Sequence, residues 1–189
     1  MLFANREQPI AGHEYTGKNV RDTREKKVVV AEESVQLVTF QVGAEEYGLD
    51  IRSIAEVVRP LRITVLPRMP EFIEGVVNLR GAIIPVVDLR KRFGLEAASG
   101  PAKKVRMLIT RGAVRGTSGD LLGLVVDGVR EVLHIPRQQI DPAPAAARGL
   151  QADFIGGVGK AAGRLVILVD ITKILSRQER EALAEAGDA

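Results

Sequence analysis

The chain has 189 residues, a formal net charge of +3 and 46% hydrophobic residues, which is enough for one or two modest domains with a true core. It contains no cysteine and only two histidines, His13 and His134, which lie far apart in the sequence. Disulfides, thiolate metal sites and cysteine nucleophiles are therefore excluded, and we expect no metal site, no cofactor and no histidine-dependent catalytic triad.

The basic residues do not form a nucleic-acid-binding pattern. They alternate with acidic residues, and aromatic residues make up only 4% of the chain, whereas such sites combine a basic stripe with stacking platforms. No apolar run approaches the length of a membrane span, and the start, MLFANREQ, lacks the hydrophobic region of a signal peptide. We therefore expect a cytoplasmic protein without direct membrane insertion.

The first part of the chain predicts disorder followed by strands. Residues 1–34 are polar, mixed in charge and without sustained periodicity, which is typical of a disordered extension. In SVQLVTFQV, Val38, Phe40 and Val42 share one face, and this period of two predicts a strand. The residues GAEE then predict a turn into a second strand, YGLDI.

The rest of the chain repeats the first half. GLDIRSIAEVV (48–58) aligns without gaps to GLVVDGVREVL (123–133), and residues 72–93 align in the same way to residues 154–175. Because the two pairings occur in the same order, we infer a duplicated unit. It implies two similar subdomains joined near residues 96–104.

Each copy contains short strands rich in Val, Ile and Leu between Gly, Pro or charged turns, which favours a small antiparallel barrel. Each copy ends with a strand, an aspartate and a short basic helix. Asp88 and Asp170 fit N-cap positions, and Gly94 fits the end of the first helix. A final helix is predicted at SRQEREALAEA, opened by the capping box of Ser176 and Glu179.

Catalytic motifs are missing. The chain has no GxSxG or HExxH sequence, and capping explains the paired aspartates. The glycine-rich run at 156–163 is not a phosphate-binding P-loop, because Phe154 stands at its first glycine position and Ala161 follows its lysine. These glycines instead indicate turn or bulge positions. His134 is interpreted as a strand-end residue.

Comparison of the two copies singles out the turn NLRG, residues 78–81. Gly81 has a glycine counterpart, but Arg80 corresponds to Ala162 and Asn78 to Lys160. The hairpin can therefore form without an arginine. Arginine offers a planar fork suited to carboxylates or backbone carbonyls, while a solvated turn residue remains the alternative.

The stretch FIEGVVNLRGAIIPVVDLRKRFGL closely resembles the CheW family, the coupling proteins of bacterial chemotaxis, and similar stretches follow the family in order from residue 35 to 176. The resemblance implies an all-β fold with short helices, in which two five-stranded SH3-like barrels are related by a pseudo-twofold. We expect the first barrel at about 35–98 and the second at about 103–170, with exchange of terminal strands left open. A C-terminal helix and tail should occupy 177–189.

The resemblance also implies a non-enzymatic adaptor. Its expected partners are the cytoplasmic tip of transmembrane chemoreceptors and the regulatory domain of the histidine kinase CheA. The family's receptor-contacting arginine falls on Arg80, next to Asn78, and its glutamate falls on Glu56. Apolar positions near the groove between the barrels fall on Ile54, Val105 and Val132.

The chain departs from the family at Pro60, which replaces the usual glycine in AEVVRP, and in its longer N-terminal extension. Because no receiver domain follows residue 176 and no phosphotransfer or ATP-binding segment precedes the barrels in this sequence, we expect neither a CheV nor a CheA architecture. Two other classes remain as alternatives. One is a nucleic-acid-binding barrel or other regulatory interaction module, and the other is a small-molecule enzyme.

Overall fold

The computed structural model describes residues 33–96, 104–113, 120–144 and 153–187, which belong to one compact unit, Glu32–Ala189. The predicted disordered extension, residues 1–34, lies outside the described residues except for its last two. The first strand begins at Ser34, where the period-two pattern predicted it.

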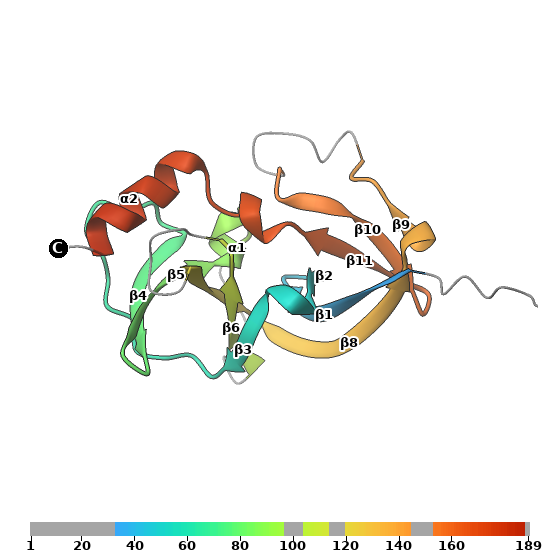
Figure 1. The fold of residues 1–189 in the computed structure, drawn as a ribbon, viewed down its shortest axis with the longest axis horizontal. Coiled ribbons are helices and arrows are strands. Elements are labelled where there is room, and N and C mark those ends of the chain that lie inside the picture. The colour runs from blue at the N-terminus through green and yellow to red at the C-terminus, as the bar shows by residue number, and fades with distance from the viewer. Residues whose placement is uncertain (1–32, 97–103, 114–119, 145–152, 188–189) are drawn as a thin grey trace, which may run out of the picture. The chain divides into compact units, whose positions relative to one another are not determined.

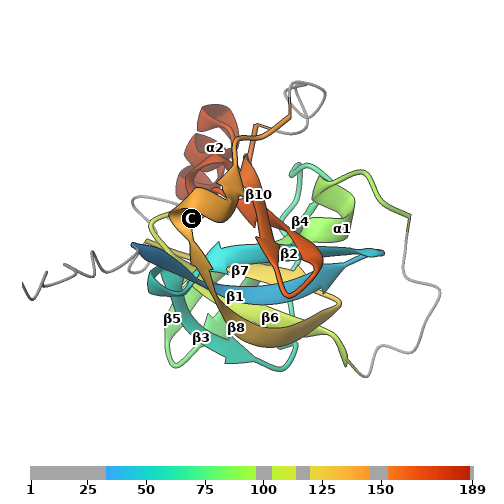
Figure 2. The same ribbon diagram turned by 90° about the vertical axis from the view of Figure 1, so that its right-hand side faces the viewer.

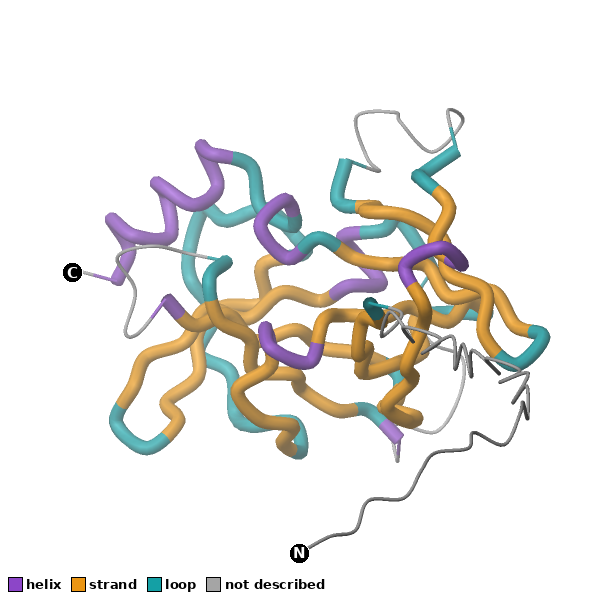
Figure 3. The backbone as a smooth tube through the Cα atoms, turned by 45° about the vertical axis from the view of Figure 1, so that its right-hand side comes forward, coloured by secondary structure: helices purple, strands orange, loops and turns teal. Residues whose placement is uncertain are grey.

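Strands dominate the described part of the chain, as Figure 3 shows. They are β1 (Ser34–Val42), β2 (Glu45–Asp50), β3 (Ile54–Val58), β4 (Ile73–Leu79), β5 (Ala82–Asp88), β6 (Arg106–Arg111), β7 (Leu121–Val126), β8 (Gly128–Pro136), β9 (Ile140–Asp141), β10 (Ile155–Ala161) and β11 (Arg164–Val169). The α-helices are α1 (Leu89–Arg92) and α2 (Arg177–Gly187), and 3-10 turns occupy Ile51–Ser53, Arg137–Gln139 and Ile171–Lys173.

The strands form two sheets with matching orders, β8-β1-β2-β11-β10-β9 and β3-β6-β7-β5-β4. In each sheet an antiparallel hairpin, β1–β2 or β6–β7, pairs in parallel with one strand of a second hairpin, β10–β11 or β4–β5. The orders correspond strand for strand except for the short β9. Figure 1 shows the two sheets, and Figure 2 views the molecule from the side of β8 to β11. The predicted all-β fold is confirmed, and the matching orders are those expected of a duplicated unit.

Each sheet takes strands from both copies of the repeat. β1 and β2 precede β3 in the sequence, yet they pair with β8 and β11 in the other sheet. β6 and β7 likewise join β3, β4 and β5. The sheets therefore cross the predicted boundary between residues 98 and 103, because the hairpin that opens each copy is exchanged. A period-two pattern identifies a strand but not its partner, so the sequence could only leave this exchange open.

Three apolar clusters follow from this topology. One is formed by β3 to β7, with Val77, Ile84 and Met107 at its centre. A smaller one lies within the other sheet and includes Leu37 and Ile135. In both clusters, strands from the two ends of the sheet order meet, as expected of a sheet curved into a barrel. The third and largest cluster combines residues of both sheets and both helices.

The predicted caps are confirmed. The Asp88 carboxylate accepts hydrogen bonds from the backbone N–H groups two and three residues later, at 2.7 and 3.3 Å. Asp170 accepts one from the N–H two residues later, at 3.1 Å, although the turn it caps is 3-10. Gly94 has a φ of +68° just after α1. Ser176 and Glu179 exchange the two hydrogen bonds of a capping box at the start of α2.

Candidate partner-binding site

The hairpin between β4 and β5 closes through a two-residue turn, Arg80-Gly81. Both residues have positive φ, 54° and 87°, which is the geometry of a type I′ turn. The corresponding turn between β10 and β11, Ala162-Gly163, has φ values of 49° and 74°. The backbone of the tip is therefore the same in both copies, and nothing in its conformation requires an arginine.

Asn78 supports this turn from inside the hairpin. Its Oδ1 accepts a hydrogen bond from the Gly81 N–H at 2.9 Å. Asn78 is exposed at the end of β4, so its amide is accessible beside Arg80. The structure gives it a turn-stabilising contact, while its predicted role in receptor binding stays a prediction.

Arg80 contacts the predicted glutamate. Its Nη2 donates to Glu56 Oε2 at 2.9 Å, with 77% of the arginine side chain and 27% of the glutamate side chain exposed. Glu56 lies on β3 at a register shift that brings it opposite Ile109. Since β3 and β4 stand at opposite ends of the sheet order, this ion pair also joins the two ends of the sheet.

The second barrel contains an equivalent ion pair that the sequence comparison missed. Glu131, the repeat counterpart of Glu56, accepts from Arg164 Nη2 at 2.6 Å, and Glu46 accepts from the same guanidinium at 3.2 Å. Glu131 and Glu46 together raise the pKa of Arg164. Arg164 stands two residues beyond Ala162, so a residue-by-residue alignment pairs it with Ala82 and hides the similarity. A search for an arginine at any position of the hairpin tip, and not at the aligned position alone, would have found this pair.

Exposed apolar side chains recur beside these ion pairs. Val57 follows Glu56 on β3, and its counterpart Val132 follows Glu131 on β8. Ile83 on β5 and its counterpart Leu165 on β11 are exposed in the same way. Each sheet thus contains an Arg–Glu pair and exposed apolar residues close to it in sequence.

The remaining predicted residues occupy different surroundings. Ile54 is half-buried two residues from Glu56 and packs against the shared cluster, and its carbonyl accepts a hydrogen bond from Arg111 at 3.1 Å. Val105 is half-buried just before β6, the neighbour of β3. Val132 lies in the other sheet, opposite Val38. The structure brings Arg80 and Glu56 into contact, with Ile54 two residues before Glu56, whereas Val105 lies just before β6 and Val132 lies on β8 in the other sheet.

Within the described residues, no three His, Cys, Asp or Glu side chains gather in a way that could hold a metal ion. The same part of the chain has no helix long and apolar enough to cross a membrane. The candidate site consists of the Arg–Glu pair and the apolar residues close to it.

A duplicated fold with exchanged hairpins and a solvent-facing Arg–Glu tip defines a β-rich interaction domain. The family model described as "CheW-like domain" matches residues 36–179, and the chain belongs to the CheW family, the coupling scaffolds of chemotaxis signalling. The predicted resemblance is thereby confirmed, and the comparisons give no support to a nucleic-acid-binding module.

Relatives match over most of their own lengths. The "Chemotaxis protein CheW" of Klebsiella aerogenes is 38% identical over 144 residues, which are 76% of this chain and 83% of that protein. The protein of the same description from Treponema pallidum is 32% identical over 85% of this chain and 94% of its own. The crystal structure of the scaffolding protein TtCheW from Thermoanaerobacter tengcongensis superposes with a TM-score of 0.69 at 37% identity, covering 79% of this chain and 97% of that one.

Proposed function

We propose that this protein is a non-enzymatic adaptor that couples transmembrane chemoreceptors to the histidine kinase CheA, with Arg80 and Glu56 at the receptor contact. It acts in the cytoplasm, at the membrane-bound receptor arrays. Family membership and the exposed Arg–Glu tip support this proposal.

The main observation in favour of a receptor contact at this site is the placement of Arg80. Its backbone adopts a left-handed conformation that arginine does not favour, with φ 54°. Its side chain is 77% exposed and makes a single ion pair, which at such exposure contributes about 0–1 kcal/mol to stability. Neither the turn nor the fold accounts for an arginine there, so a partner is the better explanation.

The geometry suits a helical hairpin as that partner. Glu56 holds one edge of the guanidinium through Nη2, and no other described residue accepts from the group, so its remaining N–H groups can donate to carbonyls or carboxylates of a docked helix. Ile54 and the exposed Val57 offer apolar surface on the same strand, as the helix-in-groove mode requires. An arginine at the centre of such a contact is a frequent hot spot.

Coupling then follows from position and requires no chemistry. A surface separate from the receptor contact binds the regulatory domain of CheA, so that receptor and kinase are held on one rigid adaptor. Receptor signalling alters kinase activity if two receptor states bind this assembly with different free energies.

The proposal is tested by co-sedimentation of the purified protein with receptor-containing membranes, with and without CheA. The wild-type protein should sediment with the membranes and increase kinase recruitment. Arg80→Ala should weaken receptor binding by about tenfold or more, the effect of losing a hot spot worth about 1.4 kcal/mol or more. The variant should fold, because Ala162 occupies the same turn position in the second copy.

Arg177→Ala is the matched control. Arg177 is an equally exposed arginine in a single ion pair with Glu181, at 2.7 Å on α2, and its loss should leave receptor binding unchanged. Wild-type binding by a folded Arg80→Ala protein would remove Arg80 from the contact. Failure of the wild-type protein to sediment or to recruit kinase would count against coupling itself.

A further inference from the structure

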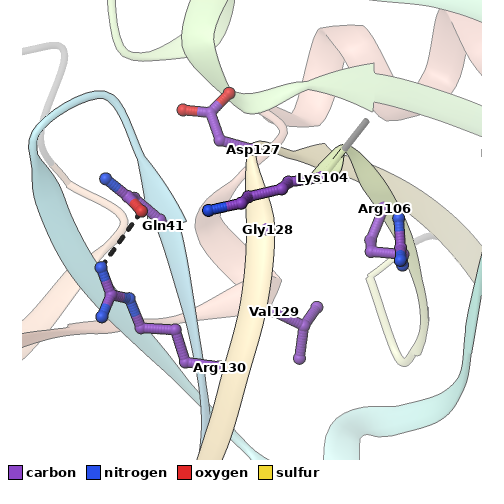
Figure 4. Close-up of a pocket in the computed structure, with 7 residues that line it drawn as sticks. All are labelled: Gln41, Lys104, Arg106, Asp127, Gly128, Val129 and Arg130. Atoms are coloured by element: carbon purple, nitrogen blue, oxygen red, sulfur yellow. Dashed lines mark hydrogen bonds between the residues drawn. The ribbon is translucent and has the colours of Figure 1, made fainter. Parts of the chain in front are cut away.

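A second polar feature lies where the chain passes from one sheet to the other. A pocket of about 360 Å³ opens around the junction of β7 and β8 and is lined by Gln41, Lys104, Arg106, Asp127, Gly128, Val129 and Arg130. Figure 4 shows the Lys104 and Arg130 side chains on the Gln41 side of the pocket and Arg106 on the opposite side. The lining therefore includes three cations and one carboxylate.

Both oxygens of the one carboxylate, that of Asp127, already accept hydrogen bonds from other parts of the chain. Asp127 Oδ2 accepts from the Gly43 N–H at 2.7 Å, and Oδ1 accepts from Arg90 Nε at 2.6 Å. Arg90 belongs to α1, does not line the pocket, and neutralises the charge of Asp127. Arg90 therefore compensates the negative charge of Asp127, and this charge does not balance the three cations that line the pocket.

None of the three cations pairs with a carboxylate of the described residues. Arg130 Nη2 donates to Gln41 Oε1 at 3.2 Å, and Gln41 is itself held by a hydrogen bond from its Nε2 to the Gly43 carbonyl at 3.0 Å. Arg106 donates only to the carbonyl of Val105, at 2.8 Å. Neutral oxygens position the guanidinium groups without using their charge.

Such a pocket selects an anion with planar acceptors. Arginine binds carboxylates through paired N–H donors, and lysine adds a point charge. Charge-assisted hydrogen bonds of this kind are about twice as strong as neutral ones.

The cations that line the pocket lie close in sequence to Val105 and Val132, two of the predicted receptor-contact residues. Lys104 and Arg106 flank Val105, and Arg130 stands two residues before Val132. We propose that this pocket receives the carboxylate of a glutamate or aspartate from the receptor's helical tip, as a contact in addition to the one at Arg80. This inference rests on the proposed function and adds a specificity contact to it.

The test is the affinity of the full chain for a fluorescently labelled cytoplasmic fragment of a chemoreceptor, measured at several salt concentrations. Lys104→Gln/Arg130→Gln should bind about tenfold or more weakly at low salt, and its affinity should fall less steeply as salt rises, because two screened attractions are gone. Lys160→Gln/Lys173→Gln removes the same charge from exposed lysines outside the pocket. That control should keep the affinity and salt dependence of the wild-type protein.

The outcomes separate the two proposals. If the wild-type protein binds and the pocket variant matches it in affinity and salt dependence, the pocket assignment is overturned and the proposed function stands. If the control variant loses as much affinity as the pocket variant, only net charge matters and the pocket assignment also falls. If the wild-type protein does not bind the fragment at all, both proposals fail.

Discussion

At position 80 the backbone conformation favours asparagine, whereas the proposed partner contact requires an arginine. The left-handed region costs a non-glycine residue about 1 kcal/mol, and Asn-Gly is the favoured pair for a type I′ turn. Arginine at φ 54° therefore destabilises the tip slightly, and its exposed ion pair with Glu56 offsets about 0–1 kcal/mol of that cost. An arginine in this unfavourable conformation at an exposed turn motivates the hypothesis of a binding role.

This conflict predicts that Arg80→Asn separates stability from binding. Asparagine adopts the turn conformation readily, so the free energy of unfolding should stay equal or rise by about 1 kcal/mol, while receptor binding should fall as in Arg80→Ala. Urea titration followed by circular dichroism measures the first quantity, since the chain has no tryptophan, and co-sedimentation measures the second.

The second copy supplies the control for this change. Ala162→Asn makes the same improvement in the equivalent turn, so it should stabilise the protein without affecting receptor binding. A loss of stability in Arg80→Asn larger than about 1 kcal/mol would mean that the Glu56–Arg80 pair is a structural contact, and the argument for a binding role would fail.

Sequence comparison could predict only some of the residues in the two Arg–Glu pairs. Arg80 and Glu56 could be predicted because a family motif marks both, and the structure places them in contact. The second ion pair, Glu131 with Arg164, could not, because its arginine comes from a different position of the tip. An arginine side chain is long enough to reach equivalent glutamates from two different positions of equivalent hairpin tips, so alignment by position does not predict the contact.

At the scale of elements, Asp127 connects three segments that are distant in the sequence. It stands between β7 and β8, and its carboxylate holds the Gly43 N–H in the β1–β2 turn and the Arg90 guanidinium of α1. Its own N–H donates to the Gln41 carbonyl at 2.9 Å. Asp127 and Arg90 are only about one-fifth exposed, so solvent screens this ion pair less than the surface pairs. The bond to Asp127 also raises the pKa of Arg90.

Asp127→Ala should therefore destabilise the protein by about 2–3 kcal/mol, since it removes the acceptor of the Gly43 N–H and the carboxylate that pairs with the partly buried Arg90 guanidinium through Nε. The free energy of unfolding from urea titration measures this change. Asp141→Ala is the control, because Asp141 forms an exposed pair with Lys160 at 3.0 Å and should contribute about 0–1 kcal/mol. Equal effects of the two substitutions would show that Asp127 is no more than a surface charge.

Local elements were more predictable than their pairing. The caps at Asp88 and Asp170 and the capping box at Ser176 follow from neighbouring residues alone, and the structure contains all three. The exchange of hairpins depends on contacts between strands far apart in the sequence, such as Val38 with Val132 and Val86 with Gly123. No local pattern encodes such a choice.

At the scale of the whole molecule, the exchanged hairpins make the two barrels one folding unit. β1 and β2 pair with β8 and β11, so each half of the chain completes the sheet of the other. The largest apolar cluster is likewise shared, with Phe40 from one sheet and Leu108 from the other both fully buried in it. If the protein holds two partners in fixed relation, as we propose, it gains rigidity from this arrangement.

The same topology predicts how the protein responds to cleavage between the copies. A chain cut within residues 97–103 should remain associated and folded, because each sheet contains strands from both fragments. Residues 1–96 alone should not fold, since β1 and β2 would lose β8 and β11 and expose unpaired edges. Size-exclusion chromatography and circular dichroism of the cut chain, of each fragment and of their mixture measure this, and mixing should restore the strand signal. An isolated fragment 1–96 with its own cooperative thermal transition would show instead that each barrel folds from consecutive residues, and that the exchange is not required for stability.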